Sequence, residues 1–200
     1  MTIKCHFGDG TAAFRCARTG EYLCAGHARL DIVSVSTRAT TSALPVRAAQ
    51  AVDYATIKEM ALAYWGETEV LCFDRTYDVL ALPALLATDD GEVAGALSYS
   101  LEGDRLNIVL LNVHPQWQGK RVARSLLAVV EEEARARGMS RLVVATSNDD
   151  LPALYLYQRL GFVLTRIKIG AILAHHGREE RGFAGIPVRD EIRLEKRLAA

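Results

Sequence analysis

The chain has 200 residues, half of them hydrophobic, which is enough for one domain with a sizeable core and a small appendage. Its 24 basic residues balance its 24 acidic residues, and this neutral charge argues against a general nucleic-acid-binding protein, which would usually be basic. The chain has no apolar run near the roughly 20 residues of a membrane span and no secretory-signal pattern at its start. We therefore expect a cytoplasmic protein that is not embedded in a membrane.

Cysteine and histidine are concentrated in residues 1–30, which are predicted to form a separate module. In a reducing cytosol such a cluster indicates metal binding before disulfide bonding. The segment is similar to small treble-clef or B-box-like zinc modules, although Gly8 and Thr19 stand where two of their paired ligands would fall. Two interpretations stay open, a zinc module that recruits a protein partner and a degenerate module held by packing. The ligands expected for tetrahedral zinc are Cys5, Cys16, Cys24 and His27.

Residues 31–46 are rich in serine and threonine, a composition typical of a linker, so the main domain is predicted to span residues 47–200. Apolar residues at helical spacing predict a helix over residues 53–65, which Gly66 ends. Two aromatic residues, Tyr64 and Trp65, close this helix. They either line a substrate cleft or form an aromatic pair in the core.

The middle of the chain is dominated by strand patterns. Strands are predicted over residues 82–88, 92–99 and 105–113, and the Asp-Asp-Gly sequence at residues 89–91 is a hairpin turn signal between the first two. The three strands are therefore expected to form an antiparallel meander. The isolated Cys72 is predicted to be a small buried hydrophobic residue.

The second half alternates helices and strands. A helix is predicted over residues 122–137, a continuous apolar strand over 141–146 and a second helix from Leu151 to Leu160. A strand followed by a helix and another strand, without a tight turn, implies that residues 105–113 and 141–146 pair in parallel. Residues 162–172 are expected to form a further strand. The alternating apolar and charged residues of 186–198 predict a final edge strand.

A short basic loop runs from Gln118 to Arg124, between the third strand of the meander and the next helix. Backbone N–H groups at a helix N-terminus are unpaired and carry partial positive charge, so they can hold a phosphate. The small residues Gly119 and Ala123 permit close approach of the backbone, and the cations of the loop can add charge. The loop therefore indicates a site for a phosphate-bearing ligand, with a solvated basic loop as the alternative.

Two motifs resemble the GNAT superfamily of acetyl-CoA-dependent N-acyltransferases. The family pattern [Q/R]-x-x-G-x-[G/A] is met at residues 118–123, with Arg121 in place of the central glycine. The family pattern N-x-x-A-x-x-x-Y-x-x-x-G-F is met at residues 150–162, with Asp150 at the asparagine position. The resemblance covers residues 47–200 and implies an α/β fold with a mixed central sheet flanked by helices. It also implies acetyl transfer from acetyl-CoA to a primary amine by direct attack in a ternary complex.

The family resemblance implies specific roles for residues of this sequence. In the family, the strand ahead of the loop bulges and splays from its parallel neighbour, and one of its N–H groups polarises the thioester carbonyl. Tyr157 stands at the position of the general acid that protonates the leaving thiolate, whereas Tyr155 points elsewhere; the alternative for Tyr157 is a core aromatic residue. The residues expected to bind the cofactor are Leu111, Asn112, Val113, Gln118, Gly119, Lys120, Arg121, Val122, Ala123, Arg124, Asn148 and Asp150.

Several points stay open at the level of sequence. Many relatives place a glutamate near the position of Asn107, so the general base is unassigned, with His114, Glu102, Glu191 or a water relay as candidates. The acceptor is either a protein or peptide amine or a small amine, and a homodimer is compatible with the sequence. The alternative function is a non-catalytic acyl-CoA-binding or metal-dependent interaction protein.

One histidine pair remains outside these motifs. Adjacent histidines suggest a metal site, but no cysteine or carboxylate accompanies His175 and His176 at ligand spacing. The segment from residue 175 to 185 is also polar and contains glycine. We therefore expect the two histidines to lie in a surface loop.

Overall fold

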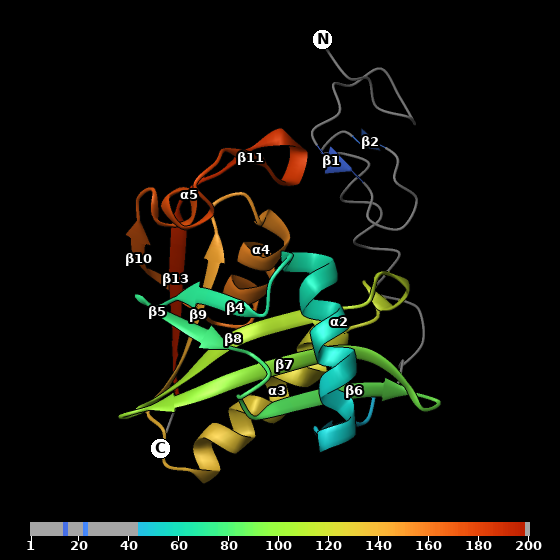
Figure 1. Ribbon diagram of the computed structural model, residues 1–200. Coiled ribbons are helices and arrows are strands. Elements are labelled where there is room, and N and C mark those ends of the chain that lie inside the picture. Colours follow the sequence, from blue (N-terminus) through green and yellow to red (C-terminus); the bar gives the residue numbers. More distant parts are fainter. Residues whose placement is uncertain (1–13, 16–21, 24–43, 199–200) are drawn as a thin grey trace. The chain divides into compact units, whose positions relative to one another are not determined.

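The computed structural model describes residues 14–15, 22–23 and 44–198 (Figure 1). The chain divides into two compact units, Met1–Ala43 and Leu44–Ala200. In the first unit, β1 (Phe14–Arg15) and β2 (Tyr22–Leu23) pair antiparallel. The predicted zinc ligands Cys5, Cys16, Cys24 and His27 lie outside the described residues, as does residue range 31–43 of the predicted linker, so the metal module stays a prediction.

A mixed seven-stranded sheet forms the centre of the second unit. Its strand order is β10-β13-β9-β8-β7-β6-β3, in which β8 and β9 pair in parallel and all other neighbours pair antiparallel. The predicted meander, the parallel pair and the mixed α/β sheet are confirmed. The strands are β3 (Val46–Ala48), β6 (Ala84–Asp89), β7 (Glu92–Glu102), β8 (Arg105–Val113), β9 (Arg141–Ser147), β10 (Val163–Lys168) and β13 (Glu191–Arg197).

Helices and short hairpins cover this sheet. None of the helices in the described ranges is long and apolar enough to cross a membrane. The helices are α2 (Tyr54–Trp65), α3 (Val122–Ala136), α4 (Leu151–Arg159) and α5 (Ala171–His176), with 3-10 turns η1 (Ala51–Asp53), η2 (Pro115–Trp117) and η3 (Phe183–Gly185). Two small antiparallel ladders lie apart from the main sheet, formed by β4 (Glu69–Cys72) with β5 (Arg75–Asp78) and by β11 (Glu180–Arg181) with β12 (Pro187–Val188).

Each face of the sheet has its own hydrophobic core. Figure 1 shows α2 and the β4–β5 hairpin on one face and α3 on the other. On the α3 face, Val122, Leu126 and Val130 are buried, as the helical spacing predicts. On the α2 face, Ile57 is fully buried against the hairpin, and Cys72 is buried there too, which raises the pKa of its thiol well above the ordinary range.

Two expectations about the last third of the chain are wrong. The strand expected over residues 162–172 ends at Lys168, because Gly170 adopts a left-handed conformation (φ 71°) and α5 begins after it. The strand expected at the edge is instead internal, since β13 lies between β10 and β9. Its charged residues suggested an edge, but Glu191 and Arg193 are buried and form an ion pair with each other.

Candidate functional site

The parallel pairing of β8 with β9 stops halfway along both strands. The last paired residues are Ile108 and Val144, although β8 continues to Val113 beside β7 and β9 continues to Ser147 beside β13. The two strands therefore diverge (Figure 1). Backbone N–H and C=O groups that face each other across this gap have no ladder partner there, and an extended ligand can pair with them.

A bulge in β8 accompanies the divergence. Ser98 of β7 pairs with Leu110 and Tyr99 pairs with Ile108, so Val109 is an extra residue on β8. Such a bulge bends its strand and increases its twist. The bulge expected from the family resemblance is therefore present, and it lies two to four residues ahead of the backbone groups assigned to the thioester.

The loop at the end of β8 contains two residues with left-handed backbone conformation. Gly119 has φ 77° and Arg121 has φ 67°, and Arg121 directly precedes α3. A residue with a Cβ in this conformation costs roughly 1–2 kcal/mol, which explains why the family pattern has glycine at the position of Arg121. No described residue accepts a hydrogen bond from the N–H groups of Arg121, Val122, Ala123 or Arg124. These amides are free to bind an anion.

Positive charge surrounds these amides. Lys120, Arg121 and Arg124 are exposed, and none of them pairs with a carboxylate among the residues that the structure describes. Gln118 closes the loop, because its Nε2 donates to the carbonyl of Val113 at 3.4 Å. The loop therefore brings backbone dipoles and exposed cations to the end of β8, next to the divergent strands.

Gly95 sets the packing beneath this loop, and sequence reasoning missed it. A Cβ at this position would lie 2.8 Å from the carbonyl oxygen of Asn112 and 2.9 Å from Cγ1 of Val122. Only glycine therefore allows β7, β8 and the first turn of α3 to approach so closely. A single glycine inside a predicted strand was the available signal.

Tyr157 lies on α4 with its ring buried. Its ring packs 5.5 Å from Phe162, centroid to centroid, and its hydroxyl makes no hydrogen bond with a described residue. Burial, and to a lesser degree the nearby Asp150, raises the pKa of Tyr157 well above its ordinary value. The phenol is therefore protonated at neutral pH and can act as a proton donor. Tyr155 points away from the core and is 66% exposed, as predicted.

Asn148 and Asp150, which are also predicted to bind the cofactor, make hydrogen bonds within the protein. Asn148 accepts hydrogen bonds from the N–H groups of Arg189 and Asp190, both at 2.8 Å, and donates to the carbonyl of Pro187 at 2.9 Å. Asp150 caps α4 by accepting from the N–H of Ala153 at 3.1 Å. Both side chains hold local structure around the end of β9.

The aromatic end of α2 lies on the other face of the sheet from α3. Trp65 is 37% exposed and donates through Nε1 to Oδ1 of Asn112 at 3.0 Å, and Tyr64 is also exposed. The interpretation of this pair as core residues is therefore wrong. Trp65 is instead fixed beside the same β8 residue that is expected to contact the acetyl donor.

The three side chains considered as general bases lie in different environments. Glu102 ends β7, roughly 25–30 Å from Val113 at the usual rise per residue of a strand, and its carboxylate is engaged by Tyr77 and Arg105. Glu191 is buried and engaged by Arg193 and by the backbone N–H of Phe73. His114 is exposed at the end of β8, beside Trp117. Only His114 of these three lies free at the loop.

His175 and His176 were expected in a surface loop, but they lie in a helix, and a carboxylate lies close to them. They end α5, and Nε2 of His175 lies 3.2 Å from Oε1 of Glu67. Glu67 precedes His175 by 108 residues, so no local spacing pattern could reveal the contact.

Comparison with known proteins places this architecture in a family. Residues 54–162, more than half of the chain, match the model of the acetyltransferase (GNAT) family. The uncharacterized protein YxbD of Bacillus subtilis (strain 168) is 29% identical over 140 residues, covering 68% of this chain and 87% of its own. Solved structures share the fold as well. The IAA acetyltransferase from Bacillus cereus ATCC 14579 has a TM-score of 0.67 and 25% identity, covering 78% of this chain and all of its own.

The second solved structure is a GNAT family acetyltransferase from Elizabethkingia anophelis with acetyl-CoA bound. Its TM-score is 0.62 at 21% identity, and the match covers 79% of this chain and all of the other. The match to the family model includes both motifs, the loop before α3 and the segment that carries Tyr157. The chain therefore belongs to the acetyltransferase (GNAT) family and is an acetyl-CoA-dependent acetyltransferase.

Proposed function

We propose that the protein transfers the acetyl group of acetyl-CoA to a primary amine by direct attack within a ternary complex. The observation that carries the proposal is the divergence of β8 and β9 beyond Ile108 and Val144. The gap offers unpaired backbone groups along an extended path, as an acyl-pantetheine arm requires. It opens beside the free amides that precede and begin α3, where a pyrophosphate is favoured.

The donor site is proposed to be made mainly of backbone. The free amides of residues 121–124 would hold the pyrophosphate, with Lys120 and Arg124 adding charge from exposed positions. The backbone of residues 111–113 would lie along the pantetheine and acetyl group. One N–H there would hydrogen-bond the thioester carbonyl more strongly as negative charge develops on its oxygen, which lowers the barrier to attack.

The chemistry requires a neutral amine and a protonated leaving group. The amine nitrogen attacks the carbonyl carbon, the C–S bond breaks, and the thiolate receives a proton. The buried phenol of Tyr157, whose raised pKa keeps it protonated, is proposed to supply that proton. The proton lost by the amine leaves through His114 or through water, since neither Glu102 nor Glu191 is free to accept it.

The acceptor is proposed to approach from the face of the sheet that carries α2. Trp65 is partly exposed there and donates a hydrogen bond to Asn112, so its indole lies beside the last residues of β8. An amine presented on an apolar or peptide chain would contact this indole. Protein or peptide amines and small amines both satisfy this arrangement.

Release of thiol from acetyl-CoA across a panel of peptide and small amines tests the proposal. Loss of a general acid lowers kcat by roughly 10²–10⁴-fold, so Tyr157→Phe is expected to reduce turnover on the best amine by that factor. Tyr155→Phe is the matched control, because Tyr155 is exposed on the same helix and should retain wild-type turnover. Binding of acetyl-CoA without thiol release on any amine, in wild type and Tyr157→Phe alike, would contradict the proposal.

A further inference from the structure

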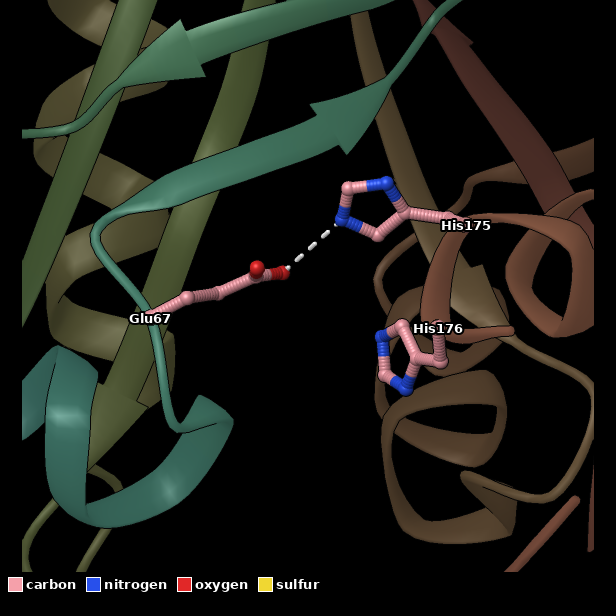
Figure 2. A group of neighbouring side chains, drawn as sticks. All are labelled: Glu67, His175 and His176. Atoms are coloured by element: carbon pink, nitrogen blue, oxygen red, sulfur yellow. Dashed lines mark hydrogen bonds and ion pairs between the residues drawn. The ribbon is translucent and has the colours of Figure 1, made fainter. Parts of the chain in front are cut away.

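Three potential metal ligands from two distant segments meet at one place on the surface. Glu67 follows the left-handed Gly66 that ends α2, and His175 and His176 end α5. Figure 2 shows the carboxylate of Glu67 and the two imidazole rings turned toward a common point. One potential ligand atom from each side chain lies within 4.8 Å of the others. We propose that Glu67, His175 and His176 form a binding site for a divalent transition metal, with zinc as the favoured ion.

The ligand set fits zinc chemistry. Two imidazoles and one carboxylate are a known zinc ligand set that leaves a fourth position for water or another ligand. Metal–ligand distances of about 2.0–2.1 Å place tetrahedral ligand atoms roughly 3.3 Å apart. Nε2 of His175 and Oε1 of Glu67 are 3.2 Å apart, which already matches one edge of such a site. The ligand atom of His176 lies within 4.8 Å of the other two and would move closer to them on metal binding. Magnesium is disfavoured, because it prefers oxygen ligands.

The orientation of His176 supports metal binding rather than a simple histidine–carboxylate contact. Its Nδ1 lies 3.4 Å from Oε2 of Glu180, and Figure 2 shows its other ring nitrogen facing Glu67 and His175. Oε1 of Glu180 is held by Arg178 at 2.8 Å, so the carboxylate is itself oriented. A carboxylate behind a histidine fixes the ring and the tautomer that presents Nε2 to a metal.

The site would join two parts of the fold that are far apart in sequence. A bound ion would tie α5 to Glu67, two residues after Trp65, whose hydrogen bond to Asn112 holds the end of α2. The three ligand side chains are between one quarter and two fifths exposed, so the ion can enter from solvent and retain an open position. The site is distinct from the N-terminal cysteine cluster, because it contains no thiolate.

Zinc titration of the full chain, in competition with a chromogenic chelator, tests the proposal. Cys5, Cys16 and Cys24 are replaced together by serine, so that the N-terminal thiolates do not contribute, and Cys72 is left in place because it is buried. This protein is expected to bind one equivalent of Zn²⁺, and His175→Gln or Glu67→Gln is expected to weaken binding by more than 100-fold. Glu180→Gln should weaken it by about 10–100-fold, as loss of an outer-shell partner does. His114→Gln is the matched control and should bind zinc like the parent protein.

No bound zinc in the triple-serine protein, or equal affinity in His175→Gln and His114→Gln made in that protein, would overturn the proposal. A second measurement covers the case in which the triple-serine protein does not fold. Co²⁺ added to the wild-type chain should give visible ligand-field bands that lose the contribution of the histidine site, and so lose intensity, in His175→Gln. Thiolate charge-transfer bands from the N-terminal cysteines should be equal in both proteins. Ligand-field bands that are unchanged by His175→Gln would place all bound metal at the cysteines and refute the site.

Discussion

Arg121 gives the sharpest test of how the loop before α3 works. It has a left-handed backbone (φ 67°), which costs a residue with a Cβ roughly 1–2 kcal/mol. Replacement by glycine removes that cost but loses roughly 0.5–1 kcal/mol, because glycine gives up more conformational freedom on folding. Arg121→Gly should therefore stabilise the protein by roughly 0.5–1 kcal/mol. For a chain of this size that is an increase of about 1–4 °C in melting temperature.

Arg121→Ala is the matched control, because it removes the guanidinium and keeps the Cβ. Its melting temperature should equal that of wild type, and Arg121→Gly should exceed both. If backbone amides form the phosphate site, both variants should bind acetyl-CoA within about threefold of wild type by calorimetry, a difference of roughly 0.7 kcal/mol. Equal stability of the glycine and alanine variants would show that the left-handed backbone at residue 121 costs no measurable stability. A loss of affinity beyond tenfold in both would show that the guanidinium is the main phosphate ligand.

Three further predictions follow from other parts of the chain. Gly95→Ala should destabilise the protein by about 1–3 kcal/mol in denaturant unfolding, because the new Cβ meets the carbonyl oxygen of Asn112 at 2.8 Å; a change below 0.5 kcal/mol would contradict the close packing. Hydrogen bonds from Arg47 and from the backbone of Gln50 lower the pKa of Asp53 to about 2, so its contribution to stability is present above its unfolded pKa, near 4, and is lost as the pH falls to about 2. The stability gap between wild type and Asp53→Asn should shrink over that pH range, and a constant gap would exclude the ion pair as its cause. If the N-terminal module binds zinc, metal analysis of purified Cys24→Ser should show one equivalent of zinc less than wild type, whereas equal contents would favour a module held by packing.

Local patterns predicted most of the fold. The Asp-Asp-Gly turn before β7 and the apolar stripe of α3 each satisfy rules that depend on neighbouring residues alone, and both elements were found as expected. The parallel pairing of β8 with β9 followed from the helix between them. The two family motifs supported the assignment because each depends on backbone conformation at a fixed place, as the left-handed Arg121 illustrates.

Contacts between distant segments could not be predicted in this way. Glu67 and His175 lie 108 residues apart, and nothing near either residue indicates the other. The hydrogen bonds of the Asn148 side chain to residues 187–190 were not predicted either, because only the folded chain brings those residues near. The position of β13 was misjudged for the same reason, since charge alternation cannot distinguish an exposed residue from one buried with a partner such as Arg193.

The internal position of β13 has a consequence for the order of folding. β10 pairs with β13 alone in the main sheet, although β10 is made more than 20 residues earlier. During synthesis, β9 therefore presents an open edge, and β10 has no strand to join, until residues 191–197 have emerged. We infer that the strands from β3 to β9 form a folding unit of their own, and that closure of the sheet by β13 and β10 is a late step.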